Sequence, residues 1–190
     1  VQKGQTLAII GNTGSGKSTI LELIGRLYDV QKGQIEVDGQ TIQNLNLNSL
    51  RSSVGFVPQD PFLFSDSLRN NIKFGKNKAS DDEVVEASKM AVVHDNITNF
   101  KNGYDTVLGE RGITLSGGQK QRISIARAFI KNPQILLLDD CLSAVDTETE
   151  EQILNNIELV TKGKTTIIVS HRISSAKNAD IIVVLNNGII

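Results

Sequence analysis

The sequence lacks the features that mark several large classes of protein. Its single cysteine, Cys141, excludes a disulfide within the chain and suits a reducing, cytosolic compartment. Its apolar runs stay well below the roughly 18 residues of a membrane-spanning helix. Lys and Arg number 20 against 21 Asp and Glu, so there is no basic excess that would predict binding to nucleic acid. A globular domain remains, and the 39% of hydrophobic residues indicates the same.

The chain shows neither a repeat of fixed period nor a low-complexity linker, and its 190 residues fit one domain. It opens with Val1 rather than Met, close to an apolar run. It closes with a turn signal at Asn187 and Gly188, followed by new apolar residues. We therefore expect the chain to be a piece of a longer polypeptide, truncated at both ends.

Short apolar runs alternate with helical patterns near both ends of the chain. Several runs are apolar on consecutive residues, as in strands buried on both faces of a parallel sheet. The alternation predicts an α/β fold with a mostly parallel sheet and right-handed crossovers. The middle, about residues 65–130, carries helical signals and is predicted as a helical insertion. Strands are predicted over residues 6–10, 35–37, 54–57, 135–138, 165–170 and 181–185, and helices over residues 18–27, 80–92, 119–130 and 147–160.

A glycine-rich segment after the first predicted strand matches the phosphate-binding P-loop pattern G-x-x-x-x-G-K-S/T. Glycines let backbone N–H groups wrap an anion, and the N-terminus of the next helix adds partial positive charge. Lys17 is expected to reach the β- and γ-phosphates of a nucleotide, and the Ser18 hydroxyl to ligate Mg²⁺. A turn with an exposed lysine is the alternative, which the flanking strand and helix disfavour. The predicted binding residues are Gly11, Asn12, Thr13, Gly14, Ser15, Gly16, Lys17, Ser18 and Thr19.

Two adjacent aspartates follow the apolar run over residues 135–138. The Mg²⁺ of a P-loop site needs a carboxylate, usually at the end of a neighbouring apolar strand. We expect Asp139 to hold the metal, directly or through water. The alternative is an aspartate that only starts a turn, which the presence of the P-loop disfavours.

The segment "TLSGGQKQR", residues 114–122, opens the third predicted helix. Ser116 fits an ordinary N-cap. Two glycines after it weaken the helix by about 1 kcal/mol per interior residue. This cost suggests that the helix end approaches a ligand closely, and a phosphate suits a bare helix N-terminus. The candidate residues are Ser116, Gly117, Gly118 and Gln119.

These motifs together resemble the ATPase domains of ATP-binding cassette (ABC) transporters. "GNTGSGKST", "LSGGQKQR", "ILLLDD", "SAVD" and "IIVSHR" occur in that family's order, and the match covers essentially the whole chain. "GFVPQDPFLFSDSLRNNIKFG" and "GERGITLSGGQ" are similar to the exporter branch, in which the ATPase follows a transmembrane segment. The resemblance implies a P-loop NTPase core over residues 1–58 and 133–190 and a Q-loop and helical subdomain over residues 59–132.

Three further site residues are implied by the resemblance. Gln59 resembles the Q-loop glutamine, which touches Mg²⁺ and senses the γ-phosphate; a turn between two prolines is its alternative. Asp146 resembles the D-loop aspartate, which acts across a dimer interface, and it also fits a helix N-cap. His171 resembles the switch histidine, which contacts the γ-phosphate; its alternative is a polar residue that closes a strand.

The resemblance also implies partners and a location. Two such domains sandwich two ATP molecules head to tail, with the "LSGGQ" segment of one facing the P-loop of the other. Glu110, Arg111 and Gly112 resemble the exporter loop that contacts the membrane domains. The chain is thus expected at the cytoplasmic face of a membrane, as part of an integral membrane transporter and without a nucleic-acid partner. His94 matches no motif and is expected at the surface, and Tyr28 is expected in the core.

Asp140 departs from the family pattern, which usually has glutamate to orient and polarise the attacking water. Aspartate is shorter by one C–C bond, roughly 1.5 Å. A misplacement of about 1 Å can cost about 10²-fold in rate. The resemblance therefore implies a site that binds Mg-ATP and hydrolyses it slowly. Exporters built from two different halves often pair one degenerate site with a competent one, which favours a heterodimer, whereas the retained His171 leaves a slow homodimer open.

Three other function classes can be compared with the same residues. ABC ATPases of DNA repair or chromosome organisation place a long coiled coil between P-loop and signature, and none fits between Lys17 and Ser116. Translation factors of the ABC type carry two cassettes and basic extensions, which the neutral charge disfavours. A regulatory module that holds ATP without hydrolysing it stays open because of Asp140.

Overall fold

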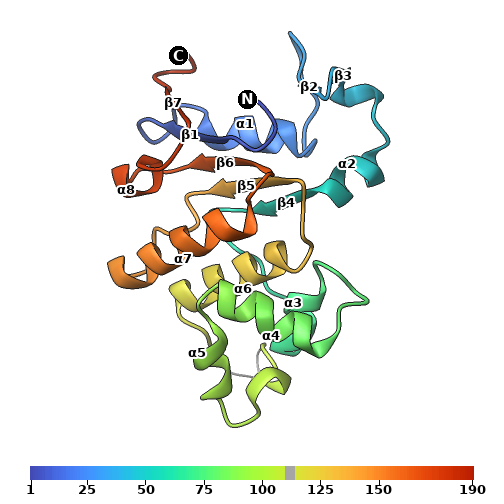
Figure 1. Ribbon diagram of the computed structural model, residues 1–190, viewed down its shortest axis with the longest axis vertical. Coiled ribbons are helices and arrows are strands. Elements are labelled where there is room, and N and C mark those ends of the chain that lie inside the picture. The colour runs from blue at the N-terminus through green and yellow to red at the C-terminus, as the bar shows by residue number, and fades with distance from the viewer. Residues whose placement is uncertain (110–113) are drawn as a thin grey trace. The chain divides into compact units, whose positions relative to one another are not determined.

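The computed structural model describes residues 1–109 and 114–190, except for two side chains at positions 173 and 174 (Figure 1). The chain forms two compact units, each described by itself. The α/β unit comprises residues 1–56, 133–140 and 163–190, and the helical unit comprises residues 57–132 and 141–162. Among the described residues, no helix has the length and apolar character needed to cross a bilayer.

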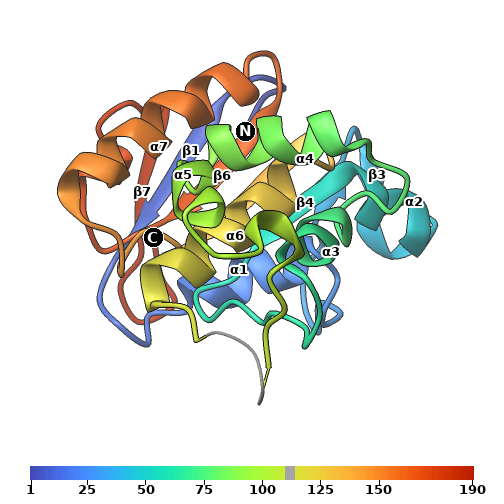
Figure 2. The same cartoon turned by 90° about the horizontal axis from the view of Figure 1, so that it is seen from below.

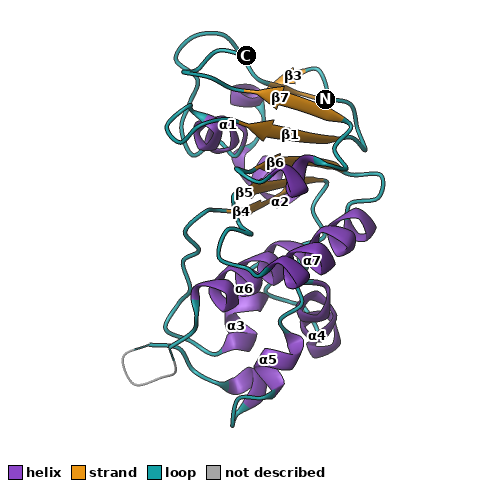
Figure 3. Cartoon of the chain, turned by 90° about the vertical axis from the view of Figure 1, so that its left-hand side faces the viewer, coloured by secondary structure: helices purple, strands orange, loops and turns teal. Residues whose placement is uncertain are grey.

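The α/β unit is built on a five-stranded sheet with the strand order β4-β5-β6-β1-β7 (Figure 3). The ladders of β1 with β6, of β1 with β7 and of β5 with β6 are all parallel, which confirms the predicted fold class. The strands are β1 (Thr6–Ile10), β4 (Val54–Val57), β5 (Ile135–Asp139), β6 (Thr165–Val169) and β7 (Ile181–Val184). A separate antiparallel pair is formed by β2 (Glu36–Val37) and β3 (Gln40–Thr41).

Consecutive apolar residues make the sheet the interior of its unit. Leu136, Leu137 and Leu138 of β5 are each at most 1% exposed, so this strand is buried on both faces. Leu137 packs in a core cluster with Ile9 of β1 and Leu21 of the first helix. The helices of this unit are α1 (Lys17–Ile24), α2 (Leu47–Ser53) and α8 (Ile173–Ala176), together with the 3₁₀ turn η1 (Ile42–Asn44).

The helical unit is arranged around α6 (Gly117–Phe129), a helix with seven buried residues. α3 (Leu68–Lys73) and α4 (Asp81–Met90) pack against α6, as Figure 2 shows. α5 (His94–Thr98) and the 3₁₀ turn η2 (Gly103–Asp105) complete this side. α7 (Thr147–Val160) packs against α4, and Asn156 donates a hydrogen bond to the Met90 carbonyl at 2.9 Å. Residues 141–162 thus belong to the helical unit, whereas the resemblance implied that they are part of the P-loop NTPase core.

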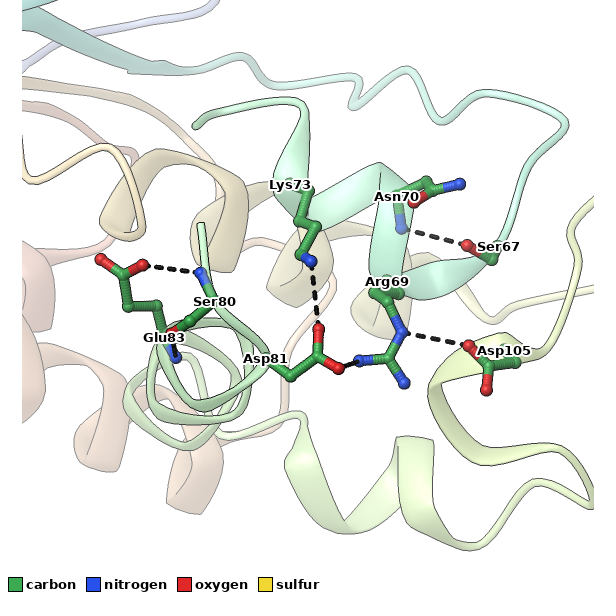
Figure 4. Close-up of polar contacts among 8 residues, drawn as sticks. All are labelled: Ser67, Arg69, Asn70, Lys73, Ser80, Asp81, Glu83 and Asp105. Atoms are coloured by element: carbon green, nitrogen blue, oxygen red, sulfur yellow. Dashed lines mark hydrogen bonds and ion pairs between the residues drawn. The ribbon is translucent and has the colours of Figure 1, made fainter. Parts of the chain in front are cut away.

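Charged residues tie three elements of the helical unit together (Figure 4). Asp81, at the start of α4, pairs with Lys73 at 3.0 Å and with Arg69 at 2.8 Å. Arg69 also pairs with Asp105 of η2 at 3.0 Å. The hydrogen bond from Lys73, followed by the one from Arg69, lowers the pKa of the exposed Asp81 carboxyl. Ser80 and Glu83 form a capping box at the start of the same helix.

One expectation about a single residue, Tyr28, is wrong, and that for His94 is incomplete. Tyr28 is 63% exposed, because α1 ends at Ile24 and the tyrosine lies beyond the face that this helix buries. His94 is not simply at the surface. Its ring is half-buried at the start of α5, where Nδ1 shares a hydrogen bond of 2.8 Å with the Tyr104 hydroxyl of η2. Both outcomes depend on where neighbouring elements end and pack.

Candidate functional site

The P-loop follows β1 and is shaped by close approach of the backbone. A Cβ on Gly11 would lie 2.1 Å from the carbonyl oxygen of Leu185, so only glycine fits there. Gly14 and Gly16 have φ angles of 80° and 97°, in the left-handed region that favours glycine. The Ser15 N–H donates to the Asn12 carbonyl at 3.1 Å and closes the turn. The loop therefore bends back over the start of α1.

The positively charged ammonium group of Lys17 lies buried inside this loop. The residue is only 5% exposed, and Nζ donates to the carbonyl oxygens of Gly11 and Asn12, each at 2.8 Å. A charge that is this buried requires polar partners, and here the loop's own carbonyls supply them. The alternative of an exposed lysine on a glycine-rich turn is thus inconsistent with the structure.

The surroundings of Lys17 fit a phosphate group. Within the described part of the chain no side chain caps the N-terminus of α1, whose N-cap is Gly16, so the first N–H groups of the helix keep their partial positive charge. The Ser15 hydroxyl is buried and has no hydrogen-bond partner among the described residues. Leaving such a group unsatisfied costs about 1–3 kcal/mol. A bound phosphate would supply negative charge to the N-terminus of α1 and an acceptor oxygen to the Ser15 hydroxyl.

Ser18 and Asp139 form the second part of the site. The Ser18 hydroxyl donates to Oδ1 of Asp139 at 2.9 Å, which joins the start of α1 to the end of β5. Asp139 is 4% exposed. Burial raises the pKa of its carboxyl, and the nearby Asp140 acts in the same direction, whereas the hydrogen bond from Ser18 and the charge of Lys17 oppose the rise.

A hydroxyl and a carboxylate are the oxygen ligands that Mg²⁺ prefers. No group of three or more His, Cys, Asp or Glu residues in the described part of the chain could hold a metal ion by itself. Mg²⁺ tolerates such sparse ligation, because it usually keeps several waters and binds through one or two carboxylates and substrate phosphates. Ser18 and Asp139 therefore fit Mg²⁺ next to a phosphate better than they fit a protein-only metal cage.

Asp140 and His171 lie at the same edge of the sheet as Asp139. The parallel strands β5 and β6 are neighbours, and Asp139 is in register with Val169. The Asp140 N–H donates to the Val169 carbonyl at 2.8 Å, and Oδ1 of Asp140 accepts from the His171 N–H at 3.5 Å. Asp140 has a φ of 41°, a left-handed conformation that is uncommon outside glycine. The backbone of Asp140 is thus held in place by β6.

In the helical unit, Ser116 begins α6 with a capping box. Its hydroxyl accepts from the Gln119 N–H at 3.2 Å, and Oε1 of Gln119 accepts from the Ser116 N–H at 3.0 Å. A Cβ on Gly118 would lie 2.8 Å from the carbonyl oxygen of Ala144, whereas a Cβ on Gly117 would meet the Ala144 side chain at an ordinary 3.5 Å. The glycine at 118 thus has a packing reason, which corrects the idea that both glycines are explained only by a ligand.

Gln59 and Asp146 also lie in the helical unit. Gln59 is an exposed loop residue after β4, and its carbonyl oxygen is 3.5 Å from Nε2 of Gln121. Asp146 caps α7, as predicted from the sequence, with Oδ1 accepting from the Thr149 N–H at 3.0 Å. That backbone hydrogen bond is the main cause that lowers the pKa of Asp146. Glu110, Arg111 and Gly112 lie outside the described residues.

Each unit therefore gathers one part of the predicted site. The α/β unit brings together the P-loop, Asp139, Asp140 and His171, and the helical unit contains Gln59, residues 116–119 and Asp146. Gln121 of α6, a glutamine only 4% exposed, is a further residue of this region that was not predicted from the sequence. The sequence pattern could have indicated its burial, because Gln121 lies four residues before the apolar Ile125 and thus on the apolar face of the helix.

Comparisons with known proteins agree with this arrangement. Residues 1–143 match the protein family described as ABC transporter. The chain is 53% identical over 188 residues to ATP-binding cassette sub-family B member 6 of Xenopus tropicalis, covering 99% of this chain and 22% of that protein. It is similar to the structure of a bacterial Atm1-family ABC exporter with ATP bound, with a TM-score of 0.94 and 47% identity, covering 99% of this chain and 33% of that one. The chain thus spans a third or less of the length of these relatives.

Asp139→Asn is expected to separate stability from metal binding. Since burial raises the pKa of Asp139, folding favours the protonated carboxyl, and the nucleotide-free protein loses stability as pH rises through that pKa. Asparagine removes this loss, so at pH 7 the melting temperature without nucleotide should stay the same or rise. The additional stabilisation by ATP that depends on Mg²⁺ should disappear. Thermal melts between pH 4 and about 8 with and without Mg-ATP test this, with the exposed Asp38→Asn as control. Persistent Mg²⁺-dependent stabilisation would contradict the assignment.

Gly118→Ala and Gly117→Ala form a matched pair for the packing at the start of α6. The new Cβ at 118 would overlap the Ala144 carbonyl, and we expect a loss of about 1–3 kcal/mol in the free energy of unfolding. At 117 the new Cβ has room, and alanine favours a helix by up to about 1 kcal/mol, so stability should stay the same or rise slightly. Urea unfolding of both variants measures the difference. Equal effects at the two positions would show that the approach of Ala144 does not matter.

Proposed function

Because the chain belongs to the ABC transporter family, we propose that it is the ATP-binding and ATP-hydrolysing domain of an exporter. The main support for this function is the P-loop that surrounds the buried Lys17, next to the hydrogen-bonded pair of Ser18 and Asp139. The protein would work at the cytoplasmic face of a membrane, together with transmembrane domains. The likeness to an Atm1-family ABC exporter with ATP bound supports this assignment.

Binding of ATP would use groups that the α/β unit already holds in place. The Lys17 ammonium would exchange its contacts with the Gly11 and Asn12 carbonyls for β- and γ-phosphate oxygens. The uncapped N-terminus of α1 and the unsatisfied Ser15 hydroxyl would face the same phosphates. Ser18 and Asp139 would hold Mg²⁺. When bound, Mg²⁺ would neutralise negative charge that develops on the phosphate oxygens.

Asp140 would orient and polarise the attacking water at this chain's own P-loop. Its carboxylate is roughly 1.5 Å shorter in reach than that of a glutamate. The backbone cannot easily advance to compensate, because the Asp140 N–H is bonded to β6 at 2.8 Å. A misplacement of about 1 Å can cost about 10²-fold. We therefore propose that this site binds Mg-ATP well and hydrolyses it slowly.

The remaining predicted residues would sense the nucleotide or serve a partner. Gln59 would touch Mg²⁺ and His171 would contact the γ-phosphate. Residues 116–119 and Asp146 would act on the nucleotide of a second ABC ATPase domain, paired head to tail with this one. A slow site at this P-loop favours a heterodimer whose other site does most of the hydrolysis, and a homodimer with two slow sites is the second arrangement.

Asp140→Glu should raise ATP turnover at this chain's own P-loop, because the added methylene restores the reach of the carboxylate. The gain should approach the penalty of about 10²-fold if geometry alone limits the step. Single-turnover rates of the full-length protein, with any partner site disabled, measure it. Asp38→Glu, at an exposed turn, is the control for a longer acidic side chain. An unchanged rate would mean that something other than side-chain length holds the site back.

Two substitutions distinguish unequal from equal sites. Gly117→Asp places bulk and a negative charge at the start of α6, where a Cβ has room, so its effect should fall on the facing nucleotide and nearly abolish hydrolysis. Lys17→Ala damages the site that is already slow, and the loss should be milder. Steady-state ATPase activity of the assembled transporter with each single change is the measurement. Equal losses would point to a homodimer or to two strongly coupled sites.

A further inference from the structure

Gln121 connects two loops of the helical unit through one buried side chain. Its Nε2 lies 3.5 Å from the Gln59 carbonyl oxygen and 3.3 Å from the Ser143 hydroxyl oxygen. Its Oε1 accepts from the Ala144 N–H at 3.2 Å. The residue is only 4% exposed, although glutamine is mostly an exposed residue type. A buried amide that keeps polar partners at both ends needs an explanation beyond filling space.

The orientation of the amide follows from its partners. The Ala144 N–H can only donate, so the atom that faces it must be the oxygen of Gln121. The nitrogen then faces Gln59 and Ser143, and the Gln59 carbonyl can only accept. The two ends of one amide are thus matched to two different loops. Reversing the amide would set a donor against a donor and an acceptor against an acceptor.

The loop after β5 is pressed onto α6 at a second point. A Cβ on Gly118 would lie only 2.8 Å from the carbonyl oxygen of Ala144. The backbone of this loop therefore contacts the helix one turn before Gln121. Gly118 and Gln121 are three residues apart and share a face of α6. Together they determine the path of the loop that leads to Asp146, the cap of α7.

We propose that Gln121 is a positioning residue that couples the loop of Gln59 to the loop of residues 143–146 through α6. This inference rests on the proposed function, in which Gln59 reads the nucleotide of this chain and residues 116–119 and Asp146 act on that of the partner. In this proposal Gln121 acts through these loops and not on the nucleotide directly. It keeps the three segments in a constant relation, so that a shift of one loop moves the others.

Gln121→Met tests the coupling, because methionine keeps the length of the side chain and removes all three polar contacts. We expect the kcat of ATP hydrolysis by the full-length protein to fall by about 10-fold, less than the roughly 10²-fold that a 1 Å misplacement can cost. The KM for Mg-ATP should change by less than about 2-fold, because Lys17, Ser18 and Asp139 belong to the other unit. Gln152→Met, at an exposed position of α7, is the matched control and should match the unsubstituted protein.

Gln121→Glu separates the link of position 121 with Gln59 from its link with Ser143 and Ala144. It also provides a second test if the methionine variant does not fold. In its ionised form, glutamate still accepts from the Ala144 N–H, and the Ser143 hydroxyl can turn to donate to it, but the carboxylate sets an oxygen without a proton against the Gln59 carbonyl. A loss of kcat at unchanged KM in this variant assigns the effect to the link with Gln59. Unchanged kcat in this variant would overturn the coupling between the loops.

A double-mutant cycle with Ser143→Ala distinguishes positioning from core packing. If Gln121 acts through the loop of residues 143–146, the kcat of the double variant with Gln121→Met should equal that of Gln121→Met alone. Losses that multiply independently, or a methionine variant with unchanged kcat, would overturn the inference and leave the proposed function standing. A protein that binds ATP and shows no hydrolysis before any substitution would overturn both.

Discussion

The parallel register of three neighbouring strands is the constraint on which the rest of the site depends. β1 is hydrogen-bonded to β6, and β6 to β5, all in the same direction. The carboxyl ends of parallel strands meet at one edge of a sheet, where ligands bind in open α/β folds. The P-loop, the aspartate pair and His171 follow these three ends directly. Residues more than 100 positions apart in the chain therefore meet, as the hydrogen bond between Ser18 and Asp139 shows.

Burial gives this edge its electrostatic character. Lys17 and Asp139 are each at most 5% exposed, so both charges interact through a medium less polar than water. Lys17 is satisfied by loop carbonyls, and Asp139 accepts from the Ser18 hydroxyl. Burial raises the pKa of the Asp139 carboxyl, although the hydrogen bond from Ser18 opposes the rise. Such an edge gains most from a ligand that brings both negative charge and a cation, which is what a nucleotide with Mg²⁺ provides.

The helical unit depends on α6 in a comparable way. Its N-terminus is satisfied by its own capping box, so the helix start is well formed before any ligand is considered. Gly118 and Gln121 then hold the loop after β5 against the helix. The salt bridges of Arg69 and Asp81 link α3, α4 and η2 on the surface, where such pairs contribute little individually. The buried amide of Gln121 is the more specific connection.

The sequence by itself determined what depends on near neighbours in the chain. The predictions for β1 and β4 agree with the structure residue for residue, and the cap at Asp146 is confirmed, because hydrophobic runs and caps act over a few residues. Only the tertiary structure decided that the Ala144 carbonyl leaves no room for a side chain at Gly118, that Tyr28 is exposed, and that α7 packs on α4. It also showed what Gln121 contacts. These features come from contacts between segments distant in the chain, which no local pattern of residue types encodes.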